Sequence, residues 1–133
     1  MRRLLLVTIL LAPAPIAAHH AFSSEFDADK PVHLKGAITK MQWMNPHGWL
    51  YIDATEVDGK PGPGGQPVPW ALEFGSPIRL MQEGWRKNDL PVGKTVTVEA
   101  YRAKNGTNTA NANKVLLPDG KELFAGSSHG ERN

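Results

Sequence analysis

The chain has 133 residues, no cysteine, 15 Lys and Arg against 13 Asp and Glu, and 41% hydrophobic residues. These values are typical of one small globular domain, and the lack of cysteine excludes disulfides, thiolate catalysis and zinc–thiolate sites. The sequence pI of about 9.0 favours a nucleic-acid partner only if Arg2 and Arg3 remain in the functional protein.

The first 18 residues have the pattern of a secretory signal peptide. A short basic start precedes an apolar run at residues 4–12, and small residues follow as far as Ala18. The apolar run is shorter than the roughly 20 residues that a membrane-spanning helix needs. We therefore expect export to the periplasm, cleavage after Ala18 and no membrane span in the mature protein. Cleavage after Ala17 is the alternative.

The expected mature chain is electrically balanced. Without Arg2 and Arg3 it carries 13 basic and 13 acidic residues, so it lacks the excess of Lys and Arg that binding to phosphates requires. We expect no nucleic-acid partner. One domain with an N-terminal arm is expected over residues 19–128, and a disordered tail over residues 129–133.

Alternating apolar and polar residues predict two strands in the first half of the domain. The first is expected over residues 32–43, with a bend at Gly36, and the second over residues 48–55. The second strand should turn its aliphatic side chains to one face and its aromatic side chains to the other. Residues 56–67 contain four Gly and three Pro and predict a flexible hairpin loop.

A short helix is expected to separate the third strand, residues 68–74, from the later strands. Ser76 and Pro77 are typical of a helix start, and Ile78, Met81 and Trp85 recur at helical spacing. Further strands are expected over residues 94–102, 114–117 and 122–124. The order predicts an all-β fold with one short helix between strands three and four, a small five- to six-stranded Greek-key barrel of the oligonucleotide/oligosaccharide-binding type. An open sandwich is the alternative.

Cleavage after Ala18 would place His19 at the mature N-terminus, followed by His20. A terminal histidine chelates a metal through its α-amino group and a ring nitrogen, and such nitrogen ligands suit Cu(II). His20, or His47 if it lies nearby, can supply a further ligand. The sequence therefore predicts a Cu(II) site at His19, His20 and His47. The alternative is that this histidine pair binds metal only adventitiously.

The second strand also predicts a ligand- or partner-binding surface. His47, Trp49 and Tyr51 fall on its non-aliphatic face, where aromatic rings and one polar group can receive a small molecule or another envelope protein. Two other interpretations remain open. His47 can hold the turn by hydrogen bonding to backbone carbonyls, and the two rings can pack beneath the N-terminal segment.

An enzyme has little support in the sequence. Glycoside hydrolysis needs a pair of carboxylates. The expected strands carry three candidates for such a pair, Asp53, Glu73 and Glu99. No nucleophile elbow, phosphate-binding loop or zinc-hydrolase motif is present. We therefore expect a non-enzymatic binding module, and the alternative is an accessory protein that docks another envelope protein.

Several short motifs also carry a resemblance to a known family. They are His19-His20-Ala21-Phe22, Asn45-Pro46-His47, Trp70-Ala71-Leu72-Glu73, Gly75-Ser76-Pro77, Gly84-Trp85, Tyr101-Arg102-Ala103-Lys104 and Leu123-Phe124-Ala125-Gly126. In this ordered set the chain resembles the domain-of-unknown-function 6152 family of small exported bacterial proteins. The resemblance implies a periplasmic location and a small β-barrel, and it implies no activity and no catalytic residues.

Overall fold

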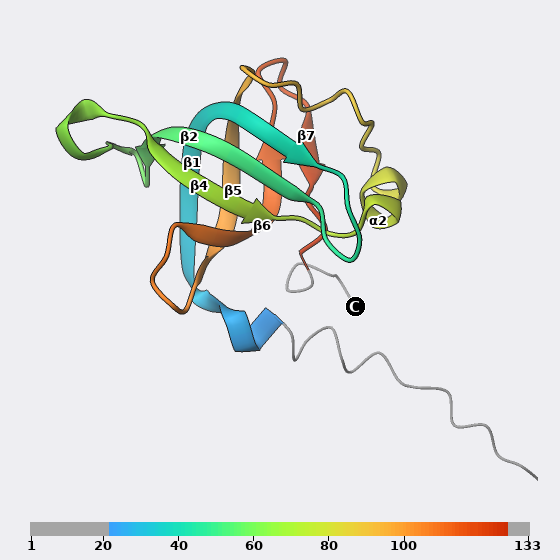
Figure 1. Ribbon diagram of the computed structural model, residues 1–133. Coiled ribbons are helices and arrows are strands. Elements are labelled where there is room, and N and C mark those ends of the chain that lie inside the picture. The colour runs from blue at the N-terminus through green and yellow to red at the C-terminus, as the bar shows by residue number, and fades with distance from the viewer. Residues whose placement is uncertain (1–21, 128–133) are drawn as a thin grey trace, which may run out of the picture.

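The computed structural model describes residues 22–127, which form one strongly curled sheet (Figure 1). The predicted signal peptide, His19, His20 and the predicted tail lie outside these residues. A helical turn at residues 22–25 leads into the sheet. The elements that follow are β1 (Phe26–Gln42), β2 (Trp49–Val57), β3 (Lys60–Pro61), the 3-10 turn η1 (Pro63–Gly65), β4 (Val68–Glu73), α2 (Pro77–Gln82), β5 (Thr95–Ala103), β6 (Thr109–Leu116) and β7 (Glu122–Phe124).

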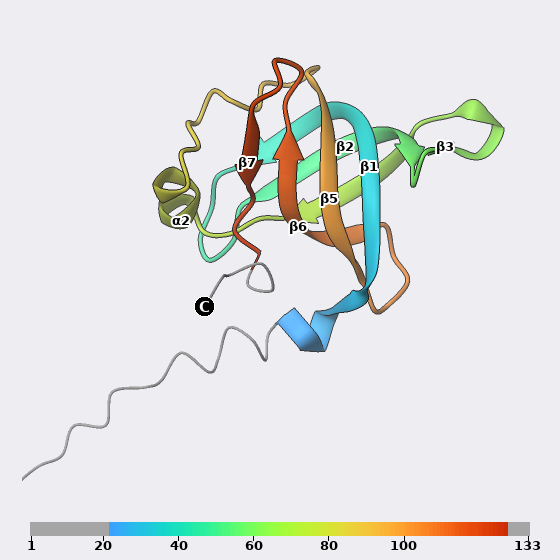
Figure 2. The ribbon, with the colours of Figure 1, turned by 180° about the vertical axis from the view of Figure 1, so that it is seen from behind.

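The five long strands are hydrogen bonded in a ring. β1 pairs antiparallel with both β2 and β5. β2 also pairs antiparallel with β4, and β5 with β6. A parallel pairing of β4 with β6 completes the ring. That parallel seam contains only three residue pairs, so the strongly curled sheet is not a true barrel, and the predicted Greek-key barrel is corrected in this respect. β7 extends the sheet beside β6 (Figure 2). The predicted all-β class with one short helix is confirmed, and the helix lies between the third and fourth long strands.

The ring depends on the bend of β1 at Gly36. Gly36 pairs with Ala54 of β2 on one side and with Val96 of β5 on the other, and the β1–β2 register shifts beside it. A Cβ atom at this position would lie 2.2 Å from the carbonyl oxygen of Asp53. Only glycine therefore allows β1 and β2 to approach so closely at the predicted bend.

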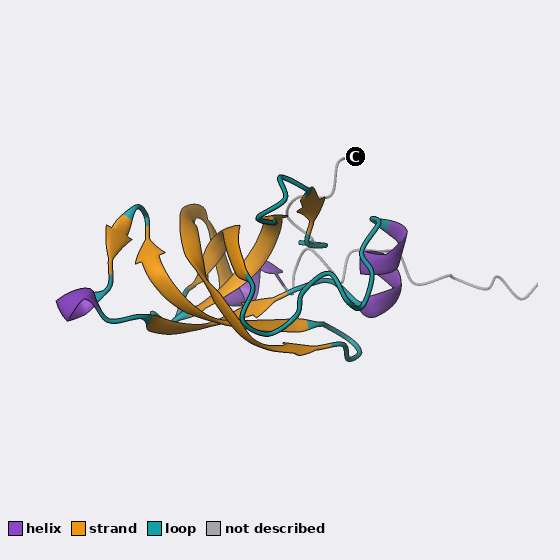
Figure 3. Cartoon of the chain, turned by 90° about the horizontal axis from the view of Figure 1, so that it is seen from above, coloured by secondary structure: helices purple, strands orange, loops and turns teal. Residues whose placement is uncertain are grey.

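Alternating aliphatic side chains and three aromatic rings, those of Trp70, Phe74 and Trp85, fill the interior. Leu50, Ile52 and Ala54 of β2 are fully buried, as their alternation predicts. α2 lies beside one end of the sheet (Figure 3). Near it, the rings of Phe74 and Trp85 lie 5.8 Å apart, and Trp85 Nε1 donates a hydrogen bond to the Phe124 carbonyl, 2.7 Å away. The ring of Trp85 thus joins the segment after α2 to β7.

The helix prediction is wrong in the residues of its apolar face. α2 ends at Gln82, and Gly84, which has a φ of 97°, stops the chain from continuing the helix. Ile78 and Met81 are 62% and 53% exposed, whereas Leu80 is the residue that α2 buries. A six-residue helix has too few turns to show a reliable apolar face, and Trp85 lies beyond its end. No helix in residues 22–127 is long and apolar enough to cross a membrane.

Three strand boundaries also differ from the predictions. β1 begins six residues early, at Phe26, because Phe26 already pairs with Ala103 of β5. The expected loop at residues 56–67 contains the short β3 and η1. β6 begins at Thr109, inside a stretch whose Asn and Thr content predicts a loop. Ala110 and Ala112 are fully buried there, because small side chains let neighbouring strands approach.

The Gly36→Ala variant tests the contact between β1 and β2. The new methyl group would overlap a carbonyl that is fixed by strand pairing, so the free energy of unfolding should fall by about 1–3 kcal/mol. Urea unfolding of the wild type and the variant measures this change. Gly48→Ala is the matched control, because its Cβ would lie 3.4 Å from the nearest atom. Equal unfolding midpoints for wild type and Gly36→Ala would contradict the argument.

Candidate functional site

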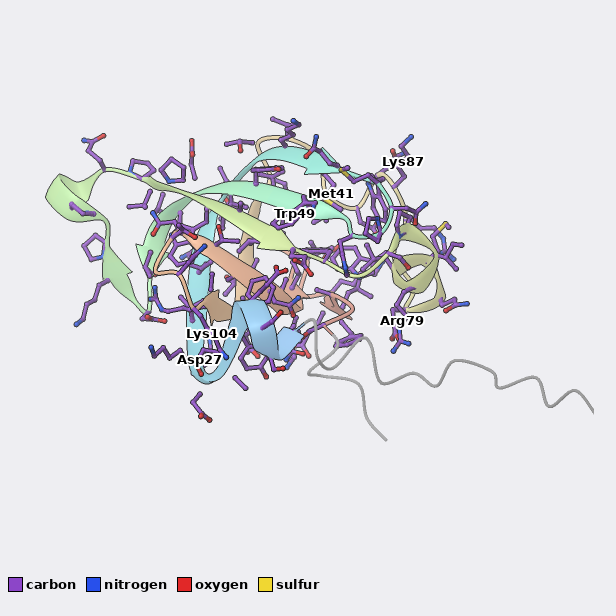
Figure 4. All side chains as sticks on the ribbon, turned by 60° about the horizontal axis from the view of Figure 1, so that its bottom comes forward. Asp27, Met41, Trp49, Arg79, Lys87 and Lys104 are labelled. Atoms are coloured by element: carbon purple, nitrogen blue, oxygen red, sulfur yellow. The ribbon has the colours of Figure 1, made fainter. Side chains whose placement is uncertain are left out.

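A pocket of about 420 Å³ opens on the outer face of the sheet, beneath the N-terminal helical turn. Figure 4 shows this turn, in blue, lying across that end of the sheet. The turn contributes Phe22 and Glu25 to the pocket, and β1 contributes Phe26. Residues 44–47 form another wall, and Trp49, Glu73 and Asn111 form the floor.

Strand register places the floor residues side by side. Trp49 of β2 is the pairing partner of Glu73 of β4, and Glu73 is the partner of Asn111 across the parallel seam. The neighbouring residues Leu50 and Leu72 point into the core, so the floor residues point outward. The helical turn covers this row, because Phe22 is only 7% exposed.

Glu73 is a buried acid with few polar neighbours. The residue is 9% exposed. Its Oε1 atom lies 3.4 Å from Asn111 Nδ2, which donates to it, and 3.5 Å from His47 Nδ1. Burial raises the pKa of Glu73 above 4.5; the charge of His47 opposes this rise, that of Glu25 adds to it, and the Asn111 hydrogen bond opposes it.

His47 combines a contact to a backbone carbonyl with a place at the pocket rim. Its Nδ1 atom lies 3.2 Å from the carbonyl oxygen of Phe74, so a proton on Nδ1 can be donated to that backbone oxygen. The same side chain lies at the pocket rim and is 47% exposed. Within residues 22–127, Nε2 of His47 has no hydrogen-bond partner. It is therefore the ring nitrogen available to a ligand.

The structure separates the two predicted aromatic residues. Trp49 lines the pocket and also a second, adjoining hollow, which extends to Lys104 and Thr109. Tyr51 lines neither. Its hydroxyl donates to Gln42 Oε1 at 3.1 Å, and Lys40 Nζ lies 5.5 Å from the centre of its ring. His47 and Trp49 therefore share a site, and Tyr51 lies outside it.

The carboxylates considered for hydrolysis do not converge on one place. Glu73 lines the pocket, but Asp53 and Glu99 do not. Glu99 lies on β5, where its carboxylate is 3.8 Å from Lys114 Nζ. The two strand carboxylates imagined as partners of Glu73 are thus absent from its surroundings.

Sequence reasoning did not find Glu25, Asn111 or the phenylalanines of the N-terminal turn. Asn111 lies in a stretch predicted as a loop, and its neighbour Glu73 is 38 residues away in the chain. Only the parallel pairing of β4 with β6 brings Asn111 beside Glu73. The one local signal is the closeness of Phe22 and Phe26 in the sequence, and in the structure their rings lie 5.8 Å apart.

Metal ligands are incomplete within residues 22–127. That part of the chain holds no group of three His, Asp or Glu side chains arranged to bind a metal ion. His47 and Glu73 lie near each other, while His19 and His20 lie outside the described residues. His20 is, however, only two residues before Phe22, which lines the pocket.

The comparison with protein families agrees with the resemblance noted in the sequence. The family model of DUF6152, a family of unknown function, matches residues 8–112. The chain belongs to the DUF6152 family. No curated protein and no solved structure matches it significantly. The family match therefore includes His47, Trp49, Glu73 and Asn111 and supplies no activity for the site that they form.

The pH dependence of stability should reveal the buried Glu73. Because its folded pKa is raised above 4.5, the folded chain holds more protons than the unfolded chain just above that pH, and its stability falls as the pH rises. Glu73→Gln has no proton to lose. The free energy of unfolding of the wild type should therefore fall relative to this variant as the pH rises above about 4.5.

Urea unfolding over that pH range measures the difference. Glu99→Gln is the matched control, because Glu99 is a half-exposed strand carboxylate with 46% of its side chain accessible. This substitution should change the free energy of unfolding by no more than roughly 0.5 kcal/mol, the scale of surface substitutions. If the free energies of unfolding of the wild type and of Glu73→Gln change with pH in the same way, burial does not raise the pKa of Glu73.

Proposed function

We propose that the mature protein is a periplasmic, non-enzymatic binding module that holds one Cu(II) ion through His19, His20 and His47. One observation carries this proposal: His47 lies at the rim of a pocket that Phe22 also lines. The sequence brings His19 and His20 to within three residues of Phe22. A mature chain that begins at His19 would therefore start three residues before a residue that lines the same pocket as His47.

The length of the tether supports shared coordination. Two residues of extended chain span at most about 7 Å, and three span at most about 11 Å. His19 can supply its α-amino group and a ring nitrogen. His20 and Nε2 of His47 can supply further nitrogen ligands, and such a nitrogen-rich set favours Cu(II) among the divalent ions.

The backbone near His47 suits it to this role. A metal-binding histidine commonly donates its second ring N–H to a carbonyl or a carboxylate, and this bond fixes the orientation of the ring. His47 Nδ1 lies 3.2 Å from the Phe74 carbonyl oxygen and 3.5 Å from Glu73 Oε1. With Nδ1 engaged there, Nε2 is left for the metal.

The copper proposal is tested on the exported protein. Mass spectrometry should find His19 at its N-terminus. Titration followed by electron paramagnetic resonance should then show one Cu(II) per chain with nitrogen ligands. His19→Ala with His20→Ala should weaken binding by more than about tenfold, and His47→Ala should alter the spectrum. Copper should be released as the pH falls through about 6.5, because imidazole must be deprotonated to bind.

Two controls make this experiment decisive. His33→Ala should leave the titration unchanged, because His33 is exposed on β1 and pairs with Glu99 of β5, away from the pocket. One extra Ala before His19 should change the spectrum, since the α-amino group then moves away from that ring. Equal copper affinity in the His19→Ala, His20→Ala variant would refute the site.

A second candidate is an accessory protein that docks another envelope protein. It is favoured by the partial exposure of Trp49 and Tyr51 on the outer face of β2. In this case Trp49→Ala with Tyr51→Ala should abolish capture of the partner from an envelope extract. The free energy of unfolding should fall by no more than about 1–2 kcal/mol, because neither ring belongs to the buried core.

Thermal unfolding of the double variant and of a Leu72→Ala control measures this cost. Leu72 is fully buried, so its truncation should cost about 2–5 kcal/mol. If the aromatic double variant unfolds as readily as Leu72→Ala, the two rings are core residues and the docking surface does not exist. Rapid turnover of glycan or ester substrates by the wild type would likewise contradict the non-enzymatic assignment.

A further inference from the structure

The floor of the pocket carries a hydrogen-bond acceptor that no described residue uses. Asn111 is 5% exposed, and its Nδ2 atom donates to Glu73. Its Oδ1 atom is buried and has no hydrogen-bond partner within residues 22–127. Buried polar atoms are nearly always satisfied in folded proteins. Because Asn111 lines the pocket, a molecule that enters the pocket can supply the missing donor.

The neighbouring groups indicate that this donor is positively charged. Glu73 and Glu25 both line the pocket, and they are close enough for the charge of one to act on the other. Within residues 22–127 neither carboxylate forms an ion pair with Lys or Arg, and the half-exposed His47 is the one basic side chain near Glu73. A cation in the pocket would offset the cost of two adjacent carboxylates.

The shape of the pocket favours an organic cation over a bare ion. Its volume of about 420 Å³ lies in the range of small-molecule sites. Phe22, Phe26 and Trp49 supply aromatic walls, and aromatic faces attract ammonium groups. Metal ions require several donors at short distance, and residues 22–127 present no group of three such side chains.

We propose that this pocket binds a primary ammonium group carried on a small aromatic or aliphatic body. The three N–H donors of a primary ammonium equal in number the three acceptors, Glu73, Glu25 and Asn111 Oδ1. The apolar body of the ligand lies against Trp49 and the two phenylalanines. This site goes beyond the copper proposal, since its contacts are oxygen acceptors on the floor and not nitrogen ligands at the rim.

The test compares two probes that differ in charge. 2-Phenylethylammonium is titrated into the mature protein and followed by amide chemical shifts and by calorimetry, with 2-phenylethanol as the neutral counterpart. The ammonium should bind more than about tenfold more tightly, the scale of one charge-assisted hydrogen bond. Its shifts should centre on β4, β6 and the helical turn. Equal affinity for the two probes would overturn the proposal.

Two isosteric variants and one control locate the contact. Glu73→Gln and Glu25→Gln should each weaken ammonium binding by about tenfold or more while leaving the weak alcohol binding unchanged. Glu25 is exposed, so its variant should fold even if Glu73→Gln does not. Glu99→Gln, a strand carboxylate outside the pocket, should bind as the wild type does. Unchanged affinity in Glu25→Gln and in any folded Glu73→Gln protein would overturn the proposal.

The α-amino group of the mature chain is itself an ammonium group and a possible occupant. The titration is therefore repeated after acetylation of that group. Equal affinity before and after acetylation supports an external ligand, whereas much tighter probe binding after acetylation would show that the chain's own terminus fills the pocket and would overturn the proposal. The His19→Ala, His20→Ala variant separates the two sites, because it should lose copper and keep the ammonium affinity.

Discussion

The three-residue parallel seam between β4 and β6 closes the sheet, and the candidate site is built on it. Without this seam, Glu73 and Asn111 would lie on separate sheet edges. In the paired strands Glu73 lies directly beside Asn111, and Trp49 of β2 lies on the other side of Glu73. The seam is short because β6 goes on to pair with β7. The strand pairing that completes the ring of strands thus also produces a polar floor on its outer face.

That floor becomes a pocket because the start of the described chain lies over it. Phe22 packs edge-on against Tyr101 with ring centres 5.7 Å apart, and the Lys104 N–H donates to the carbonyl of Glu25 at 2.9 Å. These contacts hold the helical turn against β5. Burial of the floor raises the pKa of Glu73, so the same turn that forms the pocket also sets its electrostatics.

The pocket combines two kinds of chemistry at different depths. Its rim presents His47, whose Nε2 atom has no hydrogen-bond partner within residues 22–127, and its floor presents carboxylate and amide oxygens. Nitrogen ligands select a transition metal, while unpaired oxygens beside aromatic rings select an organic cation. A single short seam and one helical turn therefore bring both sets of side chains together on one face of a small domain.

The sequence by itself determined the all-β class, the helix position, the bend at Gly36 and the two faces of β2, because each depends on local periodicity or on one residue's sterics. It also singled out His47 and Trp49. Only the tertiary structure decided that Asn111 lies beside Glu73, that Glu25 joins them and that Tyr51 does not. Those relations depend on strand register and on the covering turn, which link residues far apart in the chain and leave no periodic signal in the sequence.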